Sequence, residues 1–110
     1  MSALRYKVGS VRPWPVITFT REDENGDSQV EDLSGASSIT AKCKLEDTDT
    51  ILAEKTMVAV DAVNGQFRIE WDGDDISVAG EWVVEFTIEW DSASPELSPV
   101  DFAFTVVEAF

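Results

Sequence analysis

The most constraining feature of this sequence is the strict alternation of side chains from Gly80 to Trp90. Large apolar residues occupy every second position, namely Trp82, Val84, Phe86, Ile88 and Trp90. The intervening positions carry mostly carboxylates and a hydroxyl. Because successive side chains of a strand point to opposite faces, this spacing predicts a long, half-buried antiparallel strand rather than a helix. Three aromatic side chains on one face would supply much of a small core, so we expect this strand to be central.

Shorter alternating segments predict further strands, at residues 4–8, 14–19, 39–45, 51–60, 66–71 and 101–107. Asn25-Gly26 and Asn64-Gly65 carry the residue types that hairpin turns require, and Ile17 with Phe19 forms a predicted core pair. About seven short strands with turn signals between them are typical of a sandwich. We therefore expect an all-β, antiparallel, immunoglobulin-like β-sandwich that occupies residues 1–110 as a single domain.

Composition narrows the classes of partner. The chain has a formal net charge of −14, from 22 acidic and 8 basic residues. Such a surface repels nucleic acid and anionic lipid, so we expect neither nucleic acid nor a membrane as a partner. No stretch approaches the length of a membrane span, and the N-terminus has no apolar leader, so we expect synthesis in the cytoplasm.

The residue inventory argues against catalysis and against a bound cofactor. The chain has no histidine, which excludes Ser-His and Cys-His nucleophiles and His-containing zinc sites. Cys43, the single cysteine, lies on the apolar side of its predicted strand, and we interpret it as a buried residue rather than a reactive thiol. The acidic turn at residues 22–27 lacks the glycine and glutamate spacing of an EF-hand loop. We predict no catalytic residue, no cofactor and no metal.

Paired carboxylates are the remaining route to catalysis. Glu81, Glu85 and Glu89 share one face of the central strand. Glycosidase chemistry needs two carboxyl groups in a concave site, whereas a regular row on the polar side of a strand is typical of a solvated face. We therefore expect a protein that is not an enzyme. The same face would also suit a basic partner, and the sequence does not separate docking from solubility.

Several motifs together resemble a known family. They are Gly9-x-Val11-x-Pro13, the Asn25-Gly26 turn, residues 30–36, residues 64–71, residues 80–86, and a Pro-containing turn before the closing strand. In this order they are similar to the N-terminal domain of phage baseplate upper proteins, over nearly the whole chain. One departure is that the glycine typical of the family before the last strand is absent after Pro99. The resemblance implies a structural protein of the virion, in the tail, baseplate or a fibre adaptor, which contacts other virion proteins in symmetric copies.

Three residues are candidates for partner contacts: Tyr6, Trp14 and Phe110. Trp14 lies between Pro13 and Pro15, a stiff segment, and burial and exposure to a partner fit it equally well. Phe110 is either an exposed anchor or a cap on the core.

Two other functions are consistent with the sequence. A capsid decoration protein also uses a small sandwich domain and differs only in its location on the particle. A carbohydrate- or cell-surface-binding module would instead display a platform of exposed aromatic side chains, with or without calcium.

Overall fold

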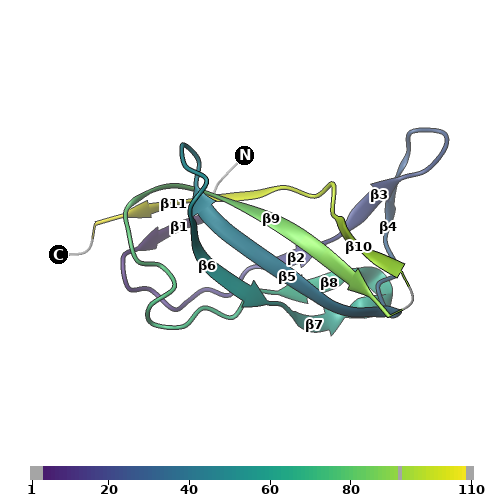
Figure 1. The fold of residues 1–110 in the computed structure, drawn as a ribbon, viewed down its shortest axis with the longest axis horizontal. Coiled ribbons are helices and arrows are strands. Elements are labelled where there is room, and N and C mark those ends of the chain that lie inside the picture. The colour runs from purple at the N-terminus through teal and green to yellow at the C-terminus, as the bar shows by residue number, and fades with distance from the viewer. Residues whose placement is uncertain (1–3, 92, 109–110) are drawn as a thin grey trace.

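The computed structural model describes residues 4–91 and 93–108, which fold into layered β-strands (Figure 1). In chain order the elements are β1 (Leu4–Lys7), β2 (Val16–Thr18), β3 (Thr20–Glu22), β4 (Ser28–Val30), β5 (Ala36–Leu45), β6 (Ile51–Thr56), β7 (Val58–Asp61), the 3-10 turn η1 (Ala62–Asn64), β8 (Gln66–Arg68), β9 (Gly80–Trp90), β10 (Ala93–Leu97) and β11 (Phe102–Val107). The described residues contain no α-helix. The predicted all-β sandwich is confirmed, with eleven strands in the described residues instead of about seven. Most are shorter than predicted, whereas β5 is longer and β9 has its predicted bounds.

Strand β9 lies at the centre of the larger sheet, as its alternation predicts. The strand order of that sheet is β1-β11-β9-β5-β6, and β10 also pairs with β9. A second sheet has the order β2-β8-β7, and β3 with β4 forms a separate hairpin. All neighbouring strands are antiparallel except β1 and β11, which run parallel. Nothing in the alternation of residues 4–8 indicates the direction of pairing, so this departure was not predictable.

Strand β10 lies where the sequence predicts only a turn-rich connection. Its pairing becomes possible because β9 is longer than either neighbour on that edge. Strand β11 covers β9 from Gly80 to Val84, and β10 covers it from Thr87 to Trp90. The backbone groups of the remaining β9 edge thereby obtain hydrogen-bond partners, although β10 itself has no alternating pattern.

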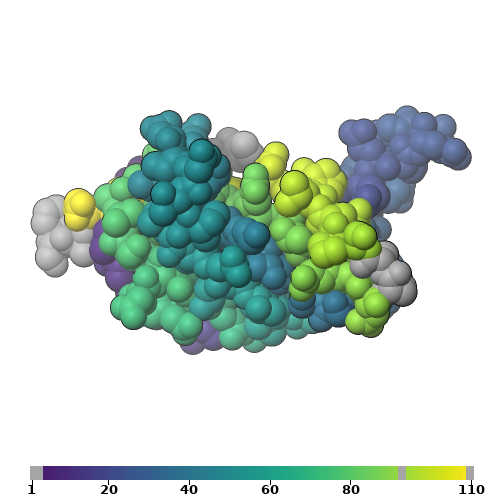
Figure 2. Space-filling model, in the orientation of Figure 1, coloured from purple at the N-terminus to yellow at the C-terminus, as the bar shows by residue number. Residues whose placement is uncertain are grey.

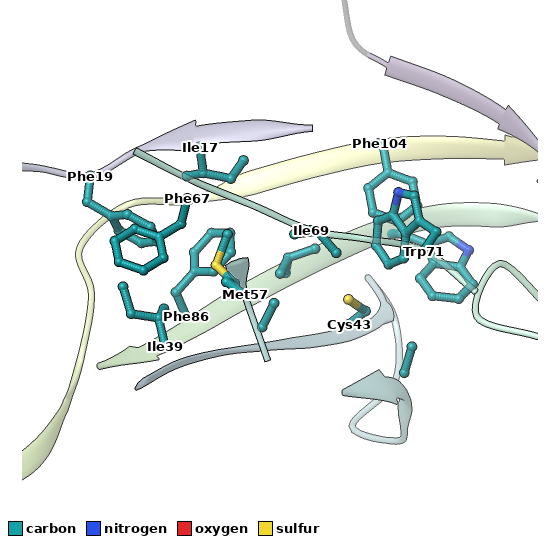
Figure 3. Packing of buried hydrophobic residues seen from close by; sticks show 14 of the residues in the cluster. Ile17, Phe19, Ile39, Cys43, Met57, Phe67, Ile69, Trp71, Phe86 and Phe104 are labelled. Carbon is teal, nitrogen blue, oxygen red and sulfur yellow. The ribbon is translucent and has the colours of Figure 1, made fainter. Parts of the chain in front are cut away.

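The apolar face of β9 and the inner face of the smaller sheet form one core (Figure 3). Trp82, Val84, Phe86 and Ile88 are each at most 2% exposed, whereas Trp90 is half-buried at the end of the strand. The opposite layer contributes the following buried residues: Ile17, Phe19, Phe67, Ile69 and Trp71. The predicted core pair of Ile17 and Phe19 is therefore confirmed.

Aromatic rings join the layers at both ends of this core. Phe19 meets Phe86 edge to face with ring centroids 5.1 Å apart, and Trp71 meets Phe104 at 5.5 Å. Such pairs each contribute about 0.5–1.5 kcal/mol beyond the area that they bury. The Phe19–Phe86 pair packs the end of β2 against the larger sheet, and the Trp71–Phe104 pair does the same for the segment after β8.

Gly65 fixes the junction between the smaller sheet and the hairpin. It follows η1 in the left-handed region, with φ of 69°. A Cβ atom at this position would lie 2.7 Å from the carbonyl oxygen of Glu31 and 2.8 Å from that of Phe19. The Phe19 amide also donates a hydrogen bond to the Gly65 carbonyl oxygen, at 2.8 Å. Only glycine allows both the backbone conformation and this close approach.

We expect Gly65→Ala to lower the free energy of unfolding by more than the roughly 1–3 kcal/mol that a strained backbone position costs, because the backbone clash adds to the strain. Urea denaturation measures the change. Gly73→Ala is the matched control, since Gly73 has open space around its Cα. Equal stability of the two variants would show that the close approach of Gly65 to the Glu31 and Phe19 carbonyl oxygens does not contribute to stability.

Candidate interaction surfaces

The hairpin of β3 and β4 projects from one end of the molecule and is the most protruding feature of the surface (Figure 2). We call residues 20–30 the arm. All side chains from residue 21 to residue 30 are exposed. At its turn, the Asp23 carboxylate accepts hydrogen bonds from the amides of Asn25 (2.9 Å) and Asp27 (3.0 Å), and Gly26 has φ of 82°. The hairpin predicted at Asn25-Gly26 is confirmed.

A network of polar side chains holds the base of the arm. Arg21 Nη2 lies 2.8 Å from Glu31 Oε2 and 2.9 Å from Glu96 Oε1. The same Glu96 oxygen accepts a hydrogen bond from Trp90 Nε1 at 3.1 Å. An open groove of about 510 Å³ separates the arm from the loop at Pro99. The Arg21–Glu96 pair is exposed on both sides and contributes little to stability by itself, whereas the Glu31 side chain is largely buried. The network fixes the position of Arg21 at the base of the arm.

The second surface lies beside the smaller sheet and is built around Trp14. Arg12 stacks over the indole ring with its Cζ atom 4.2 Å from the ring centroid, and Arg68 lies 5.3 Å from the same centroid. Arg68 also donates to Glu70 Oε2 at 2.7 Å. Both arginines are within the range of a cation–π interaction.

Two valines extend this surface across the outer side of the smaller sheet. Val16 and Val58 are the register partners of Arg68 on either side, and their exposed fractions are 52% and 37%. We call Arg12, Trp14, Val16, Val58 and Arg68 the arginine–tryptophan face. Arginine and tryptophan are residue types enriched among the energetically important residues of protein interfaces.

The three residues predicted as contacts occupy different environments. Tyr6 is only 2% exposed, and its hydroxyl donates to the Pro13 carbonyl oxygen (2.7 Å) while accepting from Trp71 Nε1 (3.1 Å). Tyr6 therefore lies in the core and not on the surface. Trp14 is half-buried: it packs against the core and carries the Arg12 and Arg68 guanidinium groups of the arginine–tryptophan face over its ring. Phe110 lies outside the described residues, and its contact role stays a prediction.

Sequence reasoning missed Arg12 and Arg68 as partners of Trp14. Arg12 is two positions away in the sequence, but Arg68 reaches the ring only because β2 and β8 pair with Val16 opposite Arg68. The spacing of Trp14 and Val16 indicates weakly that the two share a face, since both lie on the side of the segment opposite Ile17. The addition of Arg68 to this face depends on strand pairing between distant segments, which the sequence pattern does not show.

The carboxylate row of β9 is solvated, as expected. Glu81, Glu85 and Glu89 are exposed, and hydroxyls from neighbouring strands donate to two of them. Thr105 Oγ1 donates to Glu81 at 2.8 Å, and Ser38 Oγ donates to Glu89 at 2.8 Å. In the described part of the chain, no three side chains of metal-ligating type lie close enough to hold an ion, and no helix is long and apolar enough to cross a membrane.

The single thiol is enclosed by the core. Cys43 is fully buried, and burial raises its pKa from the ordinary value of 9.0 to about 12. The thiolate, which is the nucleophilic form, is therefore strongly disfavoured at neutral pH. The side chain acts as a small packing group, in agreement with its place in the alternation of β5.

Comparison with known proteins finds a structure of similar fold but no sequence family. No protein-family model matches the chain, and no curated protein is significantly similar in sequence. Among solved structures, the chain is similar to one described as the N-terminal domain of phage TP901-1 ORF48, with a TM-score of 0.57 and 14% sequence identity. The similarity covers 99% of this chain and 86% of that one. At this identity it shows that the two chains share a fold.

We expect Tyr6→Phe to lower the free energy of unfolding by about 1–3 kcal/mol, because the buried Trp71 N–H and the Pro13 carbonyl lose their shared partner. Thermal or urea denaturation measures the loss. A variant as stable as the parent would mean that these two groups are satisfied in another way and that the hydroxyl is free for other contacts.

We expect the Cys43 thiol to make stability depend on pH in the alkaline range. Because its folded pKa is raised, the contribution is fully present below pH 9 and is lost as pH rises towards 12. The difference in unfolding free energy between the parent and Cys43→Ala should fall by about 1.4 kcal/mol per pH unit over that window. A difference that does not change with pH would contradict the buried position of the thiol.

Proposed function

We propose that this protein is a structural component of a phage particle, located in the tail or baseplate, and that it acts through protein–protein contacts. The observation that carries the proposal is the shared fold with a phage domain over 99% of this chain. The resemblance of the turn and strand motifs to baseplate upper proteins supports the same location independently of the fold comparison.

The described surface supports a role in binding rather than catalysis. The thiol is buried, and the carboxylates of Glu81, Glu85 and Glu89 form a solvated row, so neither is arranged as a reactive group. Its most distinctive features are instead a projecting arm and a face that combines arginine, tryptophan and valine. Both are suited to contacts with other proteins of the particle.

A carbohydrate-binding module is less well supported. Such a module would stack sugars on exposed aromatic rings, whereas the exposed large apolar side chains of the described residues are all aliphatic, from valine, isoleucine and leucine. A decoration protein of the capsid would use the same kind of surface, so the location on the particle decides between these structural roles.

Immunogold electron microscopy tests this proposal directly. Antibody raised against the purified domain is applied to particles of the source phage or induced prophage, with antibody to the major capsid protein as the positional control. We expect gold confined to the tail end. Gold over the head would replace this proposal with a decoration role, and particles without gold would contradict a structural role in the virion.

A further inference from the structure

We propose that the acidic arm of one copy of this protein docks on the arginine–tryptophan face of a second copy. This contact deepens the proposed function because it specifies how neighbouring copies would join. It rests on the proposed function only for the expectation that several copies meet in one particle. The argument itself comes from charge distribution and shape.

Charge is strongly segregated along this chain. All 22 acidic residues follow residue 21, whereas four of the eight basic residues lie within the first 21 positions. The arm begins at the end of this segment, with Arg21 at its base, and then carries Glu22, Asp23, Glu24 and Asp27 without a basic residue between them. Asp23 is used to build the turn, but the carboxylates of Glu22 and Glu24 accept no hydrogen bond from any described residue. The arm thus presents free negative charge at a distance from the body.

The arginine–tryptophan face offers the complementary chemistry. Arg12 is exposed and makes no ion pair with any described residue, and Arg68 pairs with Glu70 alone. Each guanidinium is held in position by the Trp14 ring and keeps donors for an incoming carboxylate. The chain as a whole has a net charge of −14. On this face, two arginines that both lie over the Trp14 ring are next to the exposed side chains of Val16 and Val58.

The contact has to form between molecules, because the arm leads away from its own face. Phe19 joins β2 to β3, and its amide and carbonyl are both fixed, to Gly65 and to Glu31 respectively. From that point the arm extends outward beyond the sheets (Figure 1). The arm lies at one end of the longest axis of the molecule, which measures 47 Å against 26 Å for the shortest (Figure 1).

An arm-to-face contact joins two different surfaces and is therefore heterologous. Repetition of such a contact closes into a ring when the rotation between copies permits closure and otherwise continues as a chain. A two-stranded hairpin without a core of its own is also only marginally stable, so docking would add the missing packing partner for the arm. The net negative charge of two copies opposes their association. At about 0.15 M salt, repulsion between charges more than roughly 8 Å apart is largely screened, whereas the attraction between carboxylates and guanidiniums in direct contact is screened much less.

Charge reversal on each side of the contact tests the proposal. The arm-reversed variant carries Glu22→Lys and Glu24→Lys, and the face-reversed variant carries Arg12→Glu and Arg68→Glu. Sedimentation velocity at about 0.15 M salt measures association over a range of protein concentrations. We expect the parent to associate, each variant alone to associate at least about tenfold more weakly, and an equimolar mixture to recover association because both contacts are again complementary.

Matched controls separate this contact from an effect of net charge. Lys42→Glu with Lys44→Glu changes the net charge as the face-reversed variant does, but on the outer side of the larger sheet. Glu46→Lys with Asp47→Lys matches the arm-reversed variant, in the turn between β5 and β6. We expect both controls to associate as the parent does. If the face-reversed variant fails to fold, Arg12→Glu alone serves, because Arg12 lies in an exposed loop.

Three outcomes would overturn the contact: a parent that stays monomeric at its highest soluble concentration, variants that associate as the parent does, or a mixture that does not recover association. None of these affects the immunogold result. A monomeric chain that nevertheless labels the tail would remove the arm-to-face contact and leave the proposed function standing. A chain that associates as predicted but labels no particle would remove the proposed function and leave the arm-to-face contact standing.

Discussion

The structure depends on the burial of one face of β9 against the smaller sheet. Trp82, Val84, Phe86 and Ile88 project from a single strand into the space between the layers. Burying a large apolar side chain contributes about 1.5–3 kcal/mol, so this face supplies a substantial part of the driving force for folding. The edges of β9 then order the rest of the larger sheet, since β5 pairs along one side while β11 and β10 share the other.

Both candidate interaction surfaces follow from the way in which the chain crosses this core. Ile17 of β2 and Phe19, which follows β2, point inward, which leaves Val16 outside and places Trp14 beside Arg68. The close contact of Phe19 with Gly65 then directs the chain out of the core and into the arm. The arm and the arginine–tryptophan face are therefore held by the same packing interaction, although they point in different directions.

The sequence predicts those features that depend on local periodicity. The alternation from Gly80 to Trp90 was sufficient to predict the central strand, and Asn25-Gly26 was sufficient to predict the arm hairpin. Features that depend on pairing between distant segments were not accessible. These include the parallel pairing of β1 with β11 and the location of Tyr6 in the core beside Trp71. The candidate surface was predictable only at Trp14, because its partner Arg68 arrives through the register of β2 with β8.

The central proposal is that this sandwich is a repeated building block of a phage tail. Single-particle cryo-electron microscopy of the tail of the source phage tests this most directly. We predict repeated densities that fit the sandwich, with each arm meeting the arginine–tryptophan face of its neighbour. A tail reconstructed to side-chain resolution, with every density assigned to other proteins, would contradict the account.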